Sequence, residues 1–280
     1  MSEANEPLTA LLLNAIENVL EEGSIAALAT LTNAPKNIGT KILFPESGPV
    51  VGSFGDVALD QAVAQGAAKF LAARDAAHLF QVSDFAPELI EWAEASILFE
   101  RLEPEPRLVI CGAGHVGAAL AHLATLTGYQ AALIDDRASF VVRDRFPDDR
   151  IELIAAENWS DAVRRAIGNG RGVSVAVVTR GHNEDEECMR AVITTNADYV
   201  GLIGSKRRTN IVLDRLRAAG TEFEKLRKVH APIGLDIGAV TPEEVALAIL
   251  AEMVAARRGG TGGPLSSWRR ESSKKSKQVR

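Results

Sequence analysis

The residues best suited to chemistry begin with a glycine loop. An apolar run, LVIC, leads directly into the segment GAGHVG at 112–117, after which the chain takes on helical spacing. Such a G-x-G-x-x-G pattern permits a tight turn and presents the free N–H groups of a helix N-terminus to a phosphate. We expect Gly112, Gly114 and Gly117 either to hold a phosphate-bearing ligand or to serve only the packing of helix against strand.

Acidic residues follow the next apolar run. Asp135 and Asp136 come after AALI, about twenty residues beyond the loop, where a dinucleotide-binding fold usually holds a ribose hydroxyl. Arg137 beside them leaves room for an extra phosphate. This spacing predicts a dinucleotide-type site. His115, inside the loop, either faces the ligand or bonds to the backbone.

Two further segments place polar residues at strand ends. In TRGHNED, Arg180 is suited to phosphate, and His182 to proton transfer or metal ligation. The structural alternative is a turn in which Asn183 or Asp185 caps the next helix. In GLIGSKRR, the cations after Ser205 would begin a helix, where they oppose the helix dipole. A bound anion would explain Lys206 and Arg207, and a surface basic cluster is the alternative.

A glycine-punctuated loop, HAPIGLDIGA, carries Asp236, which we expect to be a buried acid that either faces a ligand or fastens the loop. The TPEE segment after it predicts a capping box and a helix over 242–258. No GxSxG, HExxH, P-loop or CxxC motif occurs, so the usual signals for hydrolases, zinc proteases and P-loop NTPases are missing.

The elements around these segments predict two domains. Before residue 104, helical spacing over 8–20 and 57–74 flanks short β-rich runs, which predicts an α+β domain over 1–103. SIAALATLT, GTKILF and PVVGSF are expected to form three adjacent antiparallel strands, and HLFQVS and ASILFERL two more. After 104, the apolar runs LVIC, AALI, IELI, SVAVV and YVGLI alternate with helices. They predict an α/β fold with a Rossmann-like parallel sheet over 104–259.

Composition excludes several classes. The chain has 280 residues, 46% hydrophobic and 24% charged, with a net charge of -6, as in a globular protein. No apolar run is long enough for a membrane span and the start is acidic, so a cytoplasmic protein is expected. Outside its basic C-terminal end the chain is acidic, so it lacks the clustered cations that bind nucleic-acid phosphates. The basic residues of 260–280 predict a disordered tail. Cys111 and Cys188 support no disulfide framework, and Cys111 is interpreted as a packed core residue.

Taken in order, ICGAGHVG, LIDDR, TRGHNED, GLIGSKRR and HAPIGLDIGAVTPEEVALAILAEMVAARRG resemble the xanthine dehydrogenase accessory protein family, XdhC/CoxI. The resemblance covers about residues 107–258 strongly, and the first domain more weakly through APKNIGTKIL and GSFGDVALDQAV. It implies a chaperone that binds molybdenum cofactor (molybdopterin), a phosphate-bearing pterin, and delivers it to a molybdenum hydroxylase such as xanthine dehydrogenase. The predicted cofactor-binding residues are Gly112, Gly114, His115, Gly117, Asp135, Asp136, Arg180, His182, Ser205, Lys206, Arg207 and Asp236, with no metal ligand predicted.

The chain departs from the family at two places. Similar members carry a glycine-glycine-cysteine segment where this chain has residues 56–58, and often a Cys-Gly-Gly segment near 92–94. Both cysteines are absent here. Two alternatives stay open: an NAD(P)-dependent oxidoreductase, favoured by the glycine loop and Asp135, and a degenerate family member that acts as a scaffold, favoured by the missing cysteines. A homodimer is expected, because parallel-sheet domains often pair.

Overall fold

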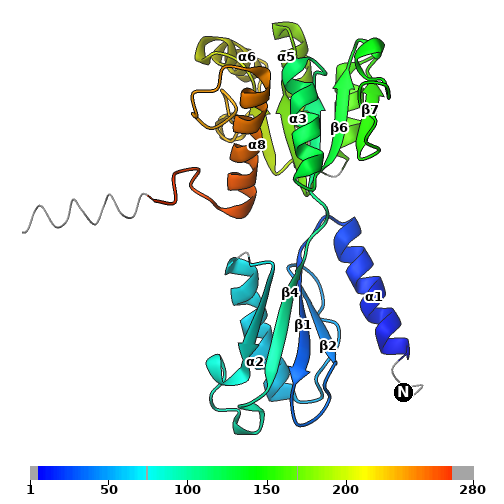
Figure 1. Ribbon diagram of the computed structural model, residues 1–280, viewed down its shortest axis with the longest axis vertical. Helices are drawn as coiled ribbons and strands as arrows, with labels where there is room; N and C mark the ends of the chain where they lie inside the picture. Colours follow the sequence, from blue (N-terminus) through cyan, green and yellow to red (C-terminus); the bar gives the residue numbers. More distant parts are fainter. Residues whose placement is uncertain (1–5, 74, 169, 267–280) are drawn as a thin grey trace, which may run out of the picture. The chain divides into compact units, whose positions relative to one another are not determined.

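A computed structural model describes residues 6–73, 75–168 and 170–266, and divides the chain into two compact units between Pro104 and Glu105 (Figure 1). The basic cluster predicted for the tail begins at Arg269 and lies outside the described residues. No described helix has the length and apolar character needed to cross a bilayer.

The first unit is a four-stranded antiparallel sheet in the order β2-β1-β4-β3. Alternate residues of its central strands, such as Ile97 and Phe99, are buried against α2 in one core, and Val19 of α1 packs with Leu28 and Leu43 in another. The predicted α+β character is confirmed. Its elements are α1 (Glu6–Glu21), β1 (Ala26–Asn33), β2 (Lys41–Pro45), α2 (Val57–Ala73), β3 (Ala77–Gln81) and β4 (Ser96–Leu102).

One predicted strand of this unit is wrong. PVVGSF was expected to be a third strand beside β1 and β2, but it makes only an isolated bridge between Val51 and Leu43. The reason lies in Gly52, whose φ of 107° turns the chain, and whose missing Cβ lets the backbone approach the Lys41 carbonyl oxygen. The chain leaves the sheet there and continues to α2.

The second unit is a five-stranded parallel sheet in the order β7-β6-β5-β8-β9, as predicted for a Rossmann-like domain. The chain goes from β5 outward to β7 and then returns to β8 on the other side, so the strand order reverses beside β5. Ligands of such sheets bind at this reversal, outside the carboxyl ends of the strands. The strands are β5 (Arg107–Cys111), β6 (Gln130–Asp135), β7 (Ile151–Ala155), β8 (Val173–Val177) and β9 (Tyr199–Leu202).

Helices cover both faces of this sheet. Leu108 and Ile110 of β5 join a core with α3 and α8, which lie side by side in Figure 1. Val109 and Cys111 point the other way, into a core built with α4, α5 and α6. Because side chains alternate along a strand, one short apolar run supplies both cores. The helices are α3 (His115–Leu126), α4 (Trp159–Ile167), α5 (His182–Val192), α6 (Lys206–Ala218), α7 (Phe223–Arg227) and α8 (Pro242–Arg258).

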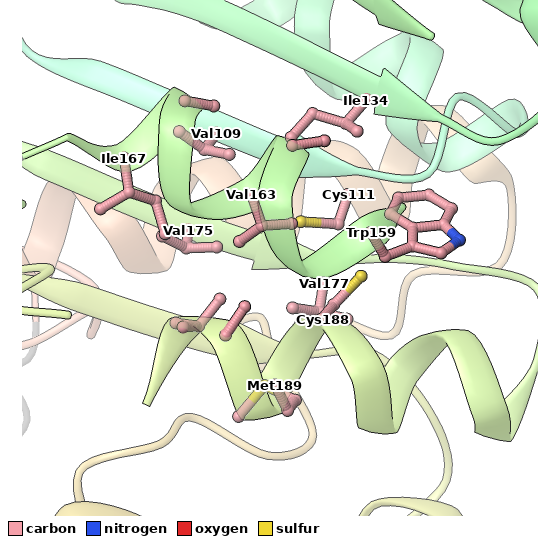
Figure 2. Close-up of a cluster of buried hydrophobic side chains, with 14 of the residues drawn as sticks. Val109, Cys111, Ile134, Trp159, Val163, Ile167, Val175, Val177, Cys188 and Met189 are labelled. Carbon is pink, nitrogen blue, oxygen red and sulfur yellow. The ribbon is translucent and has the colours of Figure 1, made fainter. Parts of the chain in front are cut away.

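The second core contains both cysteines of the chain. Figure 2 shows Cys111 and Cys188 among Val163, Val177 and Trp159, and neither cysteine has any exposed surface. Burial raises the pKa of the Cys188 thiol above its ordinary range, so this thiol is not a reactive thiolate. The interpretation of Cys111 as a packed core residue is confirmed.

The sheet is extended beyond β9 by a short segment at 230–233. His230 forms a parallel bridge with Gly201, and its backbone N–H donates to the Val200 carbonyl. A Cβ added at Gly201 would collide with the side chain of Ile233, so glycine lets the segment lie close to β9. Glu252 of α8 fastens the segment by accepting hydrogen bonds from the Tyr199 hydroxyl and the Gly234 N–H.

Candidate functional site

The glycine loop lies at the carboxyl end of the central strand β5. Gly112 has a φ of 114°, and an added Cβ would lie 2.6 Å from the Val178 carbonyl oxygen. An added Cβ at Gly117 would collide with the Gly112 carbonyl oxygen. These two glycines are therefore required by the fold itself. Gly114 differs, because nothing lies within 4 Å of the added Cβ and its backbone is extended, so its bare surface faces open space.

Helices begin along this edge of the sheet, and three of them follow neighbouring strands. His115, His182 and Lys206 are the first residues of α3, α5 and α6, which follow the neighbouring strands β5, β8 and β9. All three side chains are exposed. The N–H groups of a helix's first turn have no partner within the helix and carry partial positive charge. The edge thus collects three such helix ends after the neighbouring strands β5, β8 and β9.

Asp135 is placed differently from the prediction. The sequence assigned it to a ribose hydroxyl, but only 1% of the residue is exposed. Its carboxylate accepts hydrogen bonds from the Ala113 N–H at 2.7 Å and from the Arg137 side chain at 2.7 and 2.9 Å. Burial raises the pKa of this carboxyl, but the hydrogen bonds outweigh it and the net pKa lies below its ordinary value. Asp135 therefore fastens the glycine loop to β6.

Asp136 and Arg180 form a salt bridge across the central strand. The two guanidinium nitrogens of Arg180 lie 3.0 and 2.9 Å from the two carboxylate oxygens of Asp136. Asp136 follows β6 and Arg180 follows β8, and β5 lies between these strands in the sheet. The structure thus brings together two residues that the sequence predicted separately as ligand contacts, and it joins them to each other.

A buried network that sequence reasoning missed joins α5 to α6. Asp185 has no exposed surface, and its carboxylate accepts hydrogen bonds from the Thr179 hydroxyl and the Arg208 guanidinium. Burial raises the pKa of Asp185 above its ordinary value, while both donors act against the shift. The predicted cap by Asn183 or Asp185 is wrong, since the N-cap of α5 is Gly181 without a side-chain bond.

The start of α6 separates the roles of its polar residues. The Ser205 hydroxyl accepts a hydrogen bond from the Arg208 N–H and so caps the helix. Lys206 and Arg207 are exposed, and neither makes a salt bridge within the described residues. The predicted ligand contact of Ser205 is thus a structural cap, whereas these two cations are available to an anion.

Asp236 is exposed, which contradicts the expectation of a buried acid. The loop that carries it turns at Gly234 and Gly238, both with positive φ, and presents Ile237 and Val240 to solvent as well. The capping box that follows is confirmed: the Thr241 side chain and Glu244 exchange hydrogen bonds with each other's backbone N–H. Hydrophobic neighbours in the sequence made Asp236 look buried, although the loop bends outward.

Comparison with known proteins matches residues 108–253, more than half of the chain, to the XdhC Rossmann domain. Residues 19–82 match the XdhC and CoxI family. This chain belongs to the XdhC and CoxI family. The resemblance of the motifs predicted this membership, and it is confirmed.

Relatives of this family member include an Escherichia coli (strain K12) protein named uncharacterized protein YqeB, 35% identical over 158 residues, or 56% of this chain and 28% of that protein. Another, from Bacillus subtilis (strain 168), is named as a probable xanthine dehydrogenase subunit. It is 29% identical over 163 residues, or 58% of this chain and 46% of that protein. The matches thus span less than half the length of either curated relative.

A solved structure shares the fold of this family member. The crystal structure of a protein described as a xanthine dehydrogenase from Bacillus halodurans has a TM-score of 0.50 at 18% identity. The match covers 91% of this chain and 98% of that one. At this identity the likeness shows the fold alone.

The two segments where the resemblance implied cysteines, near 56–58 and 92–94, meet in the first unit. The Trp92 indole N–H donates to the Asp56 carboxylate at 3.1 Å, and Lys36 lies over the Trp92 ring. The other oxygen of Asp56 accepts from the N–H groups of Ala58 and Leu59 at the start of α2. Hydrogen bonds from Leu59 and Trp92 lower the pKa of Asp56 below its ordinary value. At these positions this chain has a helix cap joined to a buried indole.

Proposed function

We propose that this chain binds the phosphate of a molybdopterin-type cofactor beside its glycine loop and delivers the cofactor to a molybdenum hydroxylase such as a xanthine dehydrogenase. The observation that carries the proposal is the open surface of Gly114 next to the N-terminus of α3. A ligand phosphate needs close approach to backbone N–H groups, and Gly114 leaves room for it.

The charges along the same edge support an anionic ligand. Lys206 and Arg207 begin α6 although cations there oppose the helix dipole, and both are exposed. His115 and His182 begin the two helices on either side of the strand-order reversal. The residues present therefore fit a phosphate group. When bound, the cofactor would supply molybdenum chemistry to the enzyme that receives it.

Membership in the XdhC and CoxI family supports the choice of ligand and partner, as does the name of the Bacillus subtilis relative. Binding and delivery need no catalytic residue in this chain. The fold holds Gly112, Ala113 and Gly117 fixed through backbone contacts and Asp135, which prepares the loop before a ligand arrives.

The test is to express the full chain in cells with an intact molybdenum cofactor pathway, purify it without oxygen, and quantify the co-purifying pterin by mass spectrometry. We expect pterin with the wild type and much less with Gly114→Ala, which fills the open surface. Gly263→Ala adds the same methyl group in the C-terminal segment and serves as the control. Wild-type protein without any pterin, even after reconstitution with the isolated cofactor, would contradict the proposal and favour the scaffold alternative.

A further inference from the structure

The end of β6 decides whether a Rossmann-like sheet accepts a dinucleotide. In such folds an acid at this position accepts hydrogen bonds from the hydroxyl groups of a ribose. To do so, the carboxylate must reach the ligand and must have acceptor sites that are not already used. This chain has two acids there, Asp135 and Asp136, and each has its own partners.

Asp135 meets neither requirement. It is buried, and four N–H donors share its two oxygens: the backbone and Nε groups of Arg137 on one, and the Arg137 Nη2 group and the Ala113 N–H on the other. A ribose hydroxyl would have to displace a charge-assisted hydrogen bond in order to bind. The acceptor sites of Asp135, the acid that suggested a dinucleotide, are thus occupied by donors of the protein itself.

Arg137 is itself held in place. Its guanidinium carbon lies 3.5 Å from the ring centroid of Phe140. Phe140 is fixed in turn, because Arg145 donates to its carbonyl oxygen at 2.7 Å. A cation over an aromatic face gains electrostatic stabilisation from the ring, so turning Arg137 outward would lose two favourable contacts at once.

Asp136 is closed by a different arginine. Its two oxygens receive the paired hydrogen bonds of Arg180, which reaches over from the loop after β8. Bidentate pairs of this kind are geometrically specific and stronger than single hydrogen bonds. Asp135 therefore has no acceptor site left for a ribose, and at the exposed Asp136 a ribose would have to compete with the paired hydrogen bonds of Arg180.

We propose that Arg137 and Arg180 are specificity-determining residues that close the end of β6 to the ribose of a nicotinamide dinucleotide, so that the site selects a phosphate-bearing ligand without a ribose diol. The inference rests on the proposed function for the identity of the accepted ligand. The part of the inference that excludes NAD(P) rests on the salt bridges alone. The residues present at the end of β6 do not fit the ribose of NAD(P), which removes Asp135 as support for an oxidoreductase.

The test compares ADP with 2′-deoxy-ADP, which differ in the ribose diol, by calorimetry on the full chain. The wild type is expected to bind neither probe more tightly than about 1 mM. The double variant R137A/R180A frees both acids and is expected to gain ADP affinity. A hydrogen bond to a charged group predicts a preference for ADP over 2′-deoxy-ADP of about tenfold or more.

Arg143→Ala is the matched control, because Arg143 lies on the same loop and contacts neither Asp135 nor Asp136. It should leave ADP binding unchanged. A diol preference in the wild type, or binding of NADH or NADPH by the wild type, would overturn the proposal. So would a double variant that keeps the wild-type circular dichroism and melting profile but gains no preference for ADP.

The two proposals fail separately. Pterin retention reports on the glycine loop and the cations of α6, whereas the diol preference reports on the end of β6. Suppose that the wild type retains no pterin and shows no diol preference, while the double variant acquires a diol preference. This result would contradict the proposed function and would still support the specificity inference. The wild-type titration alone keeps the inference testable if the double variant does not fold.

Discussion

The two halves of the sheet's carboxyl edge use their charges in opposite ways. At the end of β6, Asp135 and Asp136 are each bound by an arginine of the same chain. At the start of α6, beside β9, Lys206 and Arg207 are exposed without a salt bridge in the described part of the chain. Both halves are rich in charged residues, so composition cannot tell them apart. Pairing can, because the acids at the end of β6 have arginine partners whereas the two cations of α6 are exposed.

The same contrast occurs within three consecutive residues of α6. Arg208 turns inward to the buried carboxylate of Asp185, while its two preceding neighbours stay in solvent. One basic run thus contains an anchor and two candidate ligand contacts. Substitutions along this run should therefore separate stability from binding.

The largest effect is expected for Arg208→Met. It leaves Asp185 buried without its counter-charge, which costs about 3–5 kcal/mol. Urea denaturation of the full chain measures the loss. Arg215→Met is the control, because its pair with Glu186 is partly exposed and should contribute about 1 kcal/mol or less. Equal losses in the two variants would show that Asp185 does not depend on Arg208.

A smaller loss is expected for Gly117→Ala. The added methyl group would meet the Gly112 carbonyl oxygen, and overpacking of this kind costs about 1–3 kcal/mol. Gly114→Ala adds the same group in open space and should change the melting temperature little while it lowers pterin retention. If both variants lost equal stability, Gly114 would have a structural role and its assignment to the ligand would be wrong.

Asp135→Asn should lower stability by about 2 kcal/mol at neutral pH, because it weakens charge-assisted hydrogen bonds. The folded-state pKa of Asp135 lies below its ordinary value of 3.8, so its ionised form stabilises the fold. This contribution is fully present above 3.8 and is lost as the pH falls through 3.8 toward the lower folded value. Melting temperatures of wild type and variant should therefore converge over the pH range below 3.8. A constant difference over that range would contradict this role.

The smallest effect on stability is expected for Lys206→Ala, which should stabilise the protein, unlike the substitutions above. Removal of a cation from the first turn of α6 relieves its conflict with the helix dipole, which should raise stability by about 0.3 kcal/mol. Pterin retention should fall at the same time. Thermal melting, with Lys206→Glu as a stronger version of the change, measures the gain. A destabilised Lys206→Ala protein would mean that Lys206 supports the fold.

The sequence predicted the elements of the second unit well, because continuous apolar strands and capping residues such as Thr241 are local signals. It also placed the glycine loop and the α6 cations at the correct edge. It did not reveal the arginine partners of Asp135 and Asp136, since these pairs depend on χ angles and on strands that are neighbours only in space. Arg180 lies 44 residues from Asp136 in the sequence, and no local sequence pattern indicates that they form a pair. PVVGSF failed for a related reason, because strand propensity does not reveal a glycine that turns the chain away.

The segment at 230–233 that lies along β9 bears on how copies of this chain can meet. Exposed strand margins invite further strands and can lead to polymers, and proteins commonly cover them. Here the backbone of His230 and Ile233 occupies the hydrogen-bonding groups of Val200 and Leu202 that face outward. Continuous β-sheet growth through β9 from one copy to the next is therefore blocked by the chain's own backbone. A homodimer of this protein would have to form through another surface.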